Sequence, residues 1–316
     1  MKSSKKLKIY AEKNEYYSNY LRVQLLCKHL PYEVTYFTEF NPNVALENDI
    51  VYFQSYWLYR YFVPGPKYVW DLDDVIESKE CNTERSRAYR EIEVGRCFKS
   101  VDFVIFGSEL LKEHYKDWYK CKSTVMIDYI DPCDHEATNQ KINDGKIRIG
   151  FHGTDYYDVE INDLLPVMQK LKEKYPIEFI VIGVNTAHNE IEEAGFTHIR
   201  QVPYEQFPYA LAAQGLDIGV AYYRQDKEVN LPKNHLKFSE YAWLGIPCVA
   251  SEWILGQFVP KDYFAPIKDI NDMYEAIESL IKGKELKDYK KFVEDNFSLH
   301  QIVPKYIKLF GGICES

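Results

Sequence analysis

The chain has 316 residues and a formal net charge of −9, from 39 Lys and Arg against 48 Asp and Glu. Hydrophobic residues make up 46% of it and charged residues 28%, which excludes a disordered chain and suits about two globular domains. The acidic balance disfavours a nucleic-acid partner, because binding to a phosphate backbone requires a surplus of positive charge.

The chain start and the cysteines bear on the cellular compartment. The apolar stretch behind the basic start runs only from Leu7 to Ala11 and contains Lys8, so it is shorter than the core of a signal peptide. No run approaches the length of a membrane span. The 7 Cys are odd in number and form no CxxC pair, which favours free thiols over disulfides or structural zinc. We therefore expect a cytoplasmic protein without an integral membrane segment. A peripheral position at the inner face of the membrane stays open.

Short β-rich runs alternate with helical stretches through the first part of the chain. Several are continuous apolar runs, as in strands that are buried on both faces of a parallel sheet. The expected strands are 7–11, 33–37, 49–53, 67–70, 101–106 and 123–127. Polar residues 131–145 then break the pattern and form the best candidate for a linker.

A second alternating series follows this polar segment. Its expected strands are 147–151, 177–182, 197–200, 216–221 and 246–250, and a helical stretch at 298–310 follows them. Two β/α series of similar size predict an α/β protein with two doubly wound, Rossmann-like domains that face each other. The predicted divisions are an N-terminal domain, 1–140, a C-terminal domain, 141–297, and a C-terminal helical segment, 298–316.

The first candidate site is the turn from a strand into a helix at Phe151-His152-Gly153-Thr154-Asp155. Gly153 would let a ligand approach the backbone, and Thr154 or Asp155 could cap the helix. The N-terminus of that helix would offer its free N–H groups to a phosphate. A tight turn with nothing bound is the alternative.

The second candidate site is a predicted helix in the C-terminal half. Pro232 near its start and Gly245 just past its end bracket the helix in the expected way. Lys233, Lys237 and Glu240 then stand at i, i+4 and i+7 and share one face. Ammonium groups near the positive end of a helix suit a diphosphate, and the carboxylate suits the hydroxyls of a ribose. An ordinary ion pair on a solvated face is the alternative.

The third candidate site is the run of carboxylates Asp71, Asp73 and Asp74 at the end of a strand. It looks like the metal-binding DxD of nucleotide-sugar enzymes with a single-domain fold, and like the strand-end DxD nucleophile of haloacid-dehalogenase-type phosphatases. The phosphatase motif carries a Thr where Val75 stands here. Asp73 and Asp74 could instead orient sugar or acceptor hydroxyls, or simply cap the next helix.

Residues 233–251 resemble the signature of the family-four-like, retaining glycosyltransferases with the GT-B fold. In that family a Lys, a Glu and an Ala-x-Leu-Gly-x-Pro turn precede a buried strand, and here the turn begins at Ala242. Residues 149–154 resemble the first strand and phosphate loop of the family, Gly183 matches the end of the next strand, and Tyr204 falls where the base is usually contacted. Strand, loop and helix order agree from about residue 146 to 295.

The resemblance implies a hexosyltransferase that moves a sugar from a nucleotide-diphosphate sugar to a glycan or lipid-linked acceptor, as in surface-polysaccharide biosynthesis. It implies retention of configuration, no cofactor and no obligatory metal. It also implies a cleft between two Rossmann-like domains and a last helix that crosses back to the N-terminal, acceptor-binding domain. Lys237 would stabilise the leaving diphosphate with help from Lys233, and Glu240 would bind the ribose. The other implied donor-site residues are His152, Gly153, Thr154, Gly183, Tyr204 and Asn234.

The chain also departs from the family pattern. Pro232 stands where many members carry a further Glu, and residues 184–188 lack the Arg and Lys that many members place there. Asp73 and Asp74 resemble a D-x-D-D segment of some bacterial relatives, so we expect them to act in catalysis by orienting the sugar or the acceptor. Three alternatives stay open: a Mg²⁺-dependent phosphatase, a non-catalytic nucleotide-binding subunit, and a glycosyltransferase that acts on modified nucleic acid.

Overall fold

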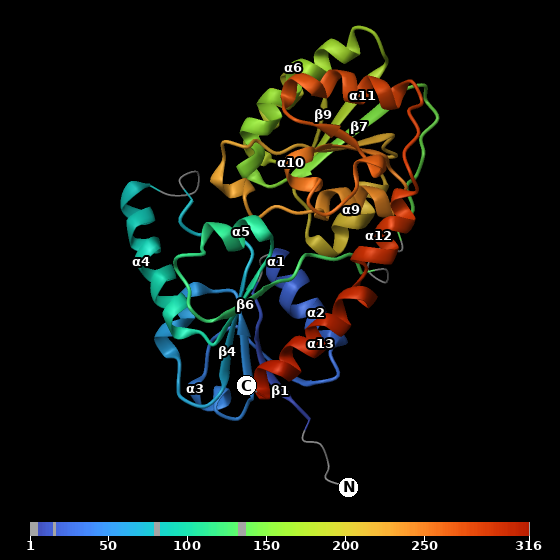
Figure 1. Cartoon of the computed structure of the whole chain (residues 1–316). Helices are drawn as coiled ribbons and strands as arrows, with labels where there is room; N and C mark the ends of the chain where they lie inside the picture. Colours follow the sequence, from blue (N-terminus) through green and yellow to red (C-terminus); the bar gives the residue numbers. More distant parts are fainter. Residues whose placement is uncertain (1–5, 15–16, 79–82, 132–136, 316) are drawn as a thin grey trace. The chain divides into compact units, whose positions relative to one another are not determined.

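The computed structural model describes residues 6–14, 17–78, 83–131 and 137–315. The chain divides into two compact units. The first holds the chain up to Tyr129 together with Leu231–Lys233 and the last helix, and the second holds Ile130–Asn230 and Asn234–Ser298. Each unit is built on a six-stranded parallel sheet (Figure 1). The predicted α/β class with two Rossmann-like units is confirmed.

The first sheet has the strand order β2-β1-β3-β4-β5-β6. The chain winds one way from β1 and the other way from β3, so the topological switch point lies between these two strands. Helices α2 and α13 lie on one side of the sheet, and α4 lies on the other (Figure 1). The strands and helices of this unit are β1 Lys8–Glu12, α1 Tyr17–Asn19, α2 Leu26–His29, β2 Glu33–Phe37, α3 Pro42–Ala45, β3 Ile50–Phe53, β4 Lys67–Leu72, α4 Glu84–Ser100, β5 Phe103–Phe106, α5 Glu109–His114, β6 Lys122–Val125 and α13 Leu299–Glu315.

The last helix, α13, packs on the sheet of the first unit, as the family resemblance implied. The Tyr52 and Phe310 rings meet edge to face at 5.3 Å between centroids. The Tyr32 hydroxyl donates a hydrogen bond of 2.8 Å to the carbonyl of Ile307. The helix can pack in this way because its buried residues recur three and four positions apart and form one apolar stripe. These residues are Leu299, Ile302, Tyr306, Phe310 and Ile313.

The second sheet has the strand order β12-β11-β10-β7-β8-β9, and its switch point lies between β7 and β10. Strand β12 was not predicted. It is a three-residue edge strand that contains Pro266, and a residue without an N–H is tolerated only at such an edge. The strands and helices of this unit are β7 Ile147–Gly153, α6 Asp158–Lys172, β8 Ile177–Gly183, α7 His188–Glu193, β9 Thr197–Ile199, α8 Phe207–Ala212, β10 Ile218–Ala221, α9 Leu236–Trp243, β11 Cys248–Ser251, α10 Glu252–Leu255, β12 Ala265–Ile267, α11 Met273–Ile281 and α12 Tyr289–Phe297.

The first boundary between the units falls after Tyr129, ahead of the predicted division at residues 140 and 141. The reason is that the polar segment is held by the second unit. The Ile130 N–H donates to the Phe297 carbonyl at 2.9 Å, and the Asn139 side chain donates to the Leu216 carbonyl at 2.9 Å. Of the predicted linker, residues 132–136 lie outside the described residues.

The described residues also bear on membranes and thiols. None of the helices in the described part of the chain is both long enough and apolar enough to cross a membrane. Cys27, Cys97, Cys121 and Cys248 carry free thiols, and Cys314 is exposed. The other two cysteines, Cys81 and Cys133, lie outside the described residues.

Candidate functional site

The strand ends at the switch point of the second sheet form the centre of the candidate site. Strand β7 ends at Gly153, which is the register partner of Gly183 at the end of β8. On the other side of β7, strand β10 leads directly into Tyr222 and Tyr223. In doubly wound sheets, ligands bind outside the carboxyl ends of the strands at such a point.

The ends of β7 and β8 approach each other so closely that only glycine fits at Gly183. This residue has a φ of +80°, and a Cβ on it would lie 1.9 Å from the carbonyl oxygen of Gly153. Val184 follows with a φ of 50°, a left-handed conformation that strains a β-branched residue. Its N–H donates to the same Gly153 carbonyl at 3.2 Å. Strain is thus stored beside the candidate site, and no pattern in the sequence predicted it.

Gly153 is needed for packing rather than to leave open space. A Cβ at this position would lie 2.5 Å from Cδ2 of Tyr157, because the Tyr157 ring covers the strand end. Neither Thr154 nor Asp155 caps the next helix, which corrects the prediction. A 3-10 turn, η3 (Asp155–Tyr157), comes first and α6 begins at Asp158. Asp155 instead accepts a hydrogen bond of 3.2 Å from the N–H of Thr186, in the turn after β8.

Helix α9 begins at Leu236 and not near Pro232, which corrects a second prediction. The Asn234 side chain accepts a hydrogen bond of 3.0 Å from the Leu236 N–H and so starts the helix. Lys233 therefore precedes the helix and does not share a face with Lys237. Lys233 groups with the first unit, where its Nζ lies 3.2 Å from Oδ1 of Asp74.

Lys237 and Glu240 stand at i and i+3 on α9, and both reach His152 at the end of β7. The Lys237 ammonium donates to the His152 carbonyl, and Oε2 of Glu240 lies 3.2 Å from Nε2 of His152. The Lys237 and Glu240 residues are 7% and 4% exposed. The imidazole of His152 packs against the Phe207 and Tyr241 rings, at 4.9 and 5.1 Å between centroids. Burial and the nearby Lys237 charge lower the pKa of His152 well below its usual range, so the imidazole is neutral at pH 7.

Three aromatic rings surround the Lys237 ammonium, and we call them the aromatic cage. Its Nζ lies 3.7 Å from the centroid of the Tyr157 ring, 4.2 Å from that of Phe151 and 5.4 Å from that of Tyr223. Electron-rich ring faces attract a cation, and they do so more strongly where water is excluded. The cage therefore holds the cation at the end of β7. Phe151 belongs to the predicted strand-to-helix motif, whereas the only signal for Tyr157 and Tyr223 in the sequence was their position beside strand ends.

Two further predicted residues flank this centre. Tyr204 is half-buried and begins the 3-10 turn η5 (Tyr204–Gln206), which leads directly to the Phe207 ring on His152. Asn234 is buried at the start of α9, as described above. Tyr204 thus lies at the periphery of the site, and the Asn234 side chain caps the backbone at the start of α9.

The loop between β10 and α9 is tied to α6 through the fully buried Glu160. Lys227 Nζ lies 2.9 Å from Oε2 of Glu160 and donates to the Tyr156 carbonyl at 2.6 Å. The Asn230 side chain donates to Oε1 of Glu160 at 2.9 Å. These contacts hold the loop that leads into α9 against η3 and α6. Sequence reasoning missed this cluster, because its members lie 67 and 70 residues apart.

In the first unit, Asp71 belongs to a buried ion-pair network. Its Oδ1 lies 2.6 Å from Nε of Arg22, and it also accepts the hydroxyl of Tyr52. Arg22, on the π-helical turn η1 (Tyr20–Leu25), donates to Asp128 and to the Met126 carbonyl, both at 2.9 Å. These contacts give Asp71 a structural role. Because Asp71 is 0% exposed, it is not placed to attack a substrate.

Asp73 and Asp74 differ sharply in environment. Asp74 is exposed and pairs with Lys233. Asp73 is half-buried, and burial together with the charge of Asp74 raises its pKa to about 7. Asp73 can therefore gain or lose a proton near neutral pH. Within the described residues, no three His, Cys, Asp or Glu side chains cluster in a way that could hold a metal ion.

The fold is shared with solved glycosyltransferase structures. No family model matches the sequence, and no curated protein matches it. Sucrose-phosphate synthase from Thermosynechococcus elongatus is similar over 97% of this chain and 99% of its own, with 12% identity and a TM-score of 0.72. HepE from Anabaena, in complex with UDP and glucose, is similar over 97% and 99%, with 12% identity and a TM-score of 0.70. A glycosyltransferase from Rickettsia africae is similar over 98% and 99%, with 13% identity and a TM-score of 0.64. The predicted GT-B fold is confirmed.

Proposed function

We propose that the chain is a retaining glycosyltransferase that moves a sugar from a nucleotide-diphosphate sugar to a glycan or lipid-linked acceptor. The observation that carries the proposal is the convergence of Lys237 and Glu240 on His152, at the switch point of the second sheet. A buried cation and a buried carboxylate three positions further along the same helix suit the two polar parts of a nucleoside diphosphate.

In this proposal Lys237 stabilises the diphosphate as it leaves. Negative charge grows on the leaving group in the transition state, and a fixed ammonium in a site that excludes water stabilises it strongly. The cation would thereby do what a bound metal does in other enzymes, so we propose that no metal is required. Glu240 would accept hydrogen bonds from two ribose hydroxyls.

The comparisons support a nucleotide-sugar donor. HepE of Anabaena, which has also been solved in complex with UDP-glucose, has a TM-score of 0.70 to this chain in that complex. The family resemblance of residues 233–251 points to the same chemistry and to retention of configuration. We further propose a role in surface-polysaccharide biosynthesis in the cytoplasm, at or near the inner face of the membrane. In the first unit, Asp73 and Asp74 would orient the sugar or the acceptor.

The test is calorimetric titration with UDP, GDP, CDP and their sugars, each with and without EDTA. We expect one nucleotide to bind equally well in EDTA. Lys237→Ala and Glu240→Ala should each weaken that binding about tenfold, which is the loss of one charge-assisted contact. Lys99→Ala, at an exposed position on α4, is the matched control and should bind like the parent protein. Undiminished affinity in both site variants would remove the assignment.

Two other functions are separated by the same samples. Release of phosphate from a phosphate ester that depends on Mg²⁺ would indicate a phosphatase, although the burial of Asp71 opposes it. Nucleotide binding with neither hydrolysis of the nucleotide sugar nor transfer of its sugar to any acceptor would indicate a non-catalytic subunit. The replacement of the usual Glu by Pro232 is the feature that favours this second possibility.

A further inference from the structure

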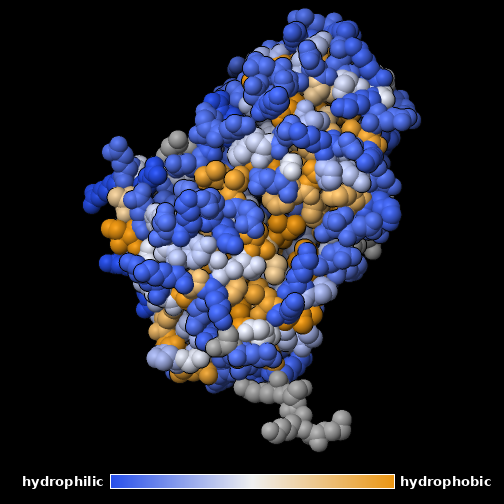
Figure 2. Space-filling view, in the orientation of Figure 1, coloured by the Kyte–Doolittle hydropathy of each residue, from blue (hydrophilic) through white to orange (hydrophobic). Residues whose placement is uncertain are grey.

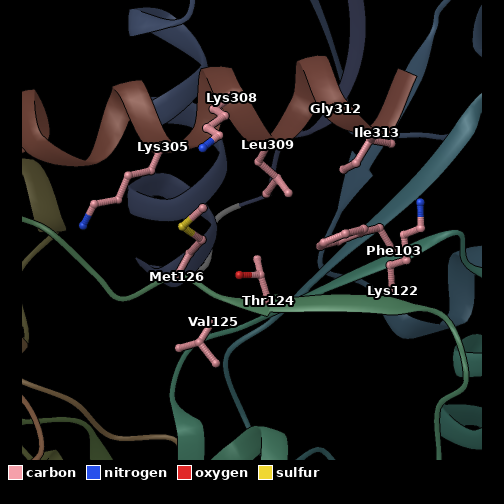
Figure 3. A pocket seen from close by; sticks show the side chains of 10 residues that line it. All are labelled: Phe103, Lys122, Thr124, Val125, Met126, Lys305, Lys308, Leu309, Gly312 and Ile313. Carbon is pink, nitrogen blue, oxygen red and sulfur yellow. The ribbon is translucent and has the colours of Figure 1, made fainter. Parts of the chain in front are cut away.

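A concave surface lies in the first unit, between strand β6 and helix α13. We call it the β6–α13 crevice. It is an open hollow with a volume of about 480 Å³, within the range of small-molecule sites. Figure 3 shows the crevice running along α13, with the side chain of Leu309 pointing into it from the helix and that of Thr124 from the strand.

Most of the crevice wall is apolar. Met126 follows β6, Phe103 begins β5, and Leu309 and Ile313 come from successive turns of α13. Figure 2 shows hydrophobic residues at the surface in the region of β6 and α13, with hydrophilic residues beside them. Burying such a surface against a hydrocarbon chain stabilises a complex because it removes apolar area from water. The wall is also pre-formed, because the Met126 carbonyl accepts the hydrogen bond of the buried Arg22.

Three lysines border the crevice, and all are exposed. Lys305 and Lys308 lie toward one end of it and Lys122 toward the other (Figure 3). Among the described residues, the side chains that line it include no Asp or Glu. In the part of the chain that the structure describes, none of the three makes an ion pair, whereas other exposed lysines, such as Lys174, pair with a carboxylate. A protein with a net charge of −9 thus carries a local surplus of positive charge around an apolar hollow.

Gly312 lines the crevice and leaves that part of its wall without a side chain. A glycine inside a helix is destabilising relative to alanine, so its presence there needs a reason. A Cβ on Gly312 would meet nothing within 4 Å, and Gly312 lines the crevice. A Cβ on the neighbouring Gly311 would also meet nothing within 4 Å, but Gly311 does not line it. The two glycines therefore form a matched pair for an experiment.

We propose that the β6–α13 crevice binds the phosphate end of a single-chain lipid. The phosphate lies between Lys305 and Lys308, and the first part of the hydrocarbon chain lies along Met126, Leu309 and Ile313. The distance along α13 from Lys305 to Ile313 is about 12 Å, enough for a chain segment rather than a headgroup alone. Charge complementarity favours an anionic headgroup, and the apolar wall distinguishes a lipid phosphate from inorganic phosphate. The proposal does not depend on the proposed transferase activity, because all of its residues lie in the first unit.

The test measures binding of dodecyl phosphate, below the concentration at which it forms micelles, to the full chain by calorimetry. Inorganic phosphate and dodecanol are the comparison ligands. We expect dodecyl phosphate to bind at least about tenfold more tightly than either, because each lacks half of the interaction. Gly312→Leu should weaken binding about tenfold by filling the crevice, and Gly311→Leu should leave it unchanged. Lys305→Glu combined with Lys308→Glu should abolish binding and its dependence on salt.

Thermal unfolding of each variant shows whether it folds. If Gly312→Leu does not fold, the variant with Lys305→Glu and Lys308→Glu still tests the proposal. Equal affinity of the Gly312→Leu and Gly311→Leu variants would overturn the proposal, as would equal affinity for inorganic phosphate and dodecyl phosphate. Capture of the protein by phosphatidic acid vesicles that is insensitive to Gly312→Leu would also overturn it, in favour of a bilayer surface. Loss of nucleotide binding alone would count against the proposed function and leave this inference standing.

Discussion

The ammonium nitrogen of Lys237 lies 3.7 Å from the centroid of the Tyr157 ring, and the same ring covers Gly153 at the end of β7. One side chain therefore both attracts the cation and fills the space above the strand end. A cation–π contact with a desolvated ammonium is worth about 2 kcal/mol. Tyr157 thus acts as a positioning residue for Lys237, in the turn that joins β7 to α6.

Replacing Tyr157 should separate its ring from its hydroxyl. Tyr157→Phe keeps the ring, and we expect nucleotide affinity to stay within about twofold of the parent value. Tyr157→Ala removes the nearest ring of the aromatic cage, and affinity should fall about tenfold because Lys237 loses its closest cation–π contact. Calorimetric titration with the bound nucleotide measures both. Tyr156→Ala, at the exposed neighbouring position, is the control, and an equal loss in that variant would show that the cage has no special role.

Lys233 and Lys237 should differ in their effect on nucleotide binding. Lys233 precedes α9 and pairs with Asp74, whereas Lys237 reaches the end of β7. We expect Lys233→Ala to change nucleotide affinity less than about threefold and Lys237→Ala to lower it about tenfold. Titrations of the two variants side by side provide the measurement. A larger loss in Lys233→Ala would restore the original assignment, in which both lysines bind the diphosphate.

The sequence predicted the fold well because strand signals are local. Short β-rich runs, several of them continuous and apolar, marked the strands of both sheets, and of the strands in the described part of the chain only β12, a short edge strand with a proline, was missed. The order of strands and helices then allowed few topologies besides two doubly wound units. The predicted start of α9 was wrong. Proline is common at the first position of a helix, so Pro232 indicated an earlier start, but the helix begins later, where the Leu236 N–H donates to the Asn234 side chain.

The candidate site was predictable only where one short segment supplied it. Lys237 and Glu240 share a helix, so their spacing alone put them on one face. The aromatic cage joins Phe151, Tyr157 and Tyr223 from separate segments, and Glu160 meets Lys227 across 67 residues. Contacts of that kind depend on tertiary packing, which no spacing in the sequence encodes.

Gly183 and Gly95 should respond in opposite ways to substitution by alanine. Gly183→Ala places a Cβ 1.9 Å from a backbone oxygen at a φ of +80°, so the two strand ends must separate and the protein should lose several kcal/mol of stability. Gly95 lies in α4, and a Cβ there meets nothing within 4 Å, so Gly95→Ala should stabilise by about 0.5–1 kcal/mol. Urea unfolding of both variants gives the free energies. Similar values for the two would contradict the close approach at β7 and β8.

Removing Arg22 should be more damaging than removing its whole ion pair. Arg22→Met leaves Asp71 buried without its partner, and breaking a buried pair in this way costs about 3–5 kcal/mol. The double variant Arg22→Met with Asp71→Leu removes both charges and should be more stable than Arg22→Met alone. Urea unfolding of the single and double variants measures the coupling. Strict additivity would show that the two side chains do not interact.

Asp73 should make both stability and transfer depend on pH near neutrality. Burial and the charge of Asp74 raise its pKa from 3.8 to about 7, so the folded state holds this proton more tightly than the unfolded state does. The resulting stabilisation is fully present below about pH 4 and is lost as the pH rises through about 7. Between about pH 5 and about pH 8 this costs the parent protein about 3 kcal/mol, so its unfolding midpoint should fall by roughly 5 °C relative to that of Asp73→Asn.

The transfer rate should change in the opposite direction. An ionised Asp73 accepts a hydrogen bond from an acceptor hydroxyl more strongly than a protonated one, so the rate should rise with pH through about 7. Asp74→Asn removes the neighbouring charge and should move this rise to lower pH, while Asp73→Asn should lower the rate about tenfold or more and remove the rise. Nucleotide affinity, measured on the same samples, should stay unchanged in both variants, because neither carboxylate belongs to the unit that holds Lys237. Normal transfer with an unshifted pH profile in both variants would exclude the two carboxylates from the reaction.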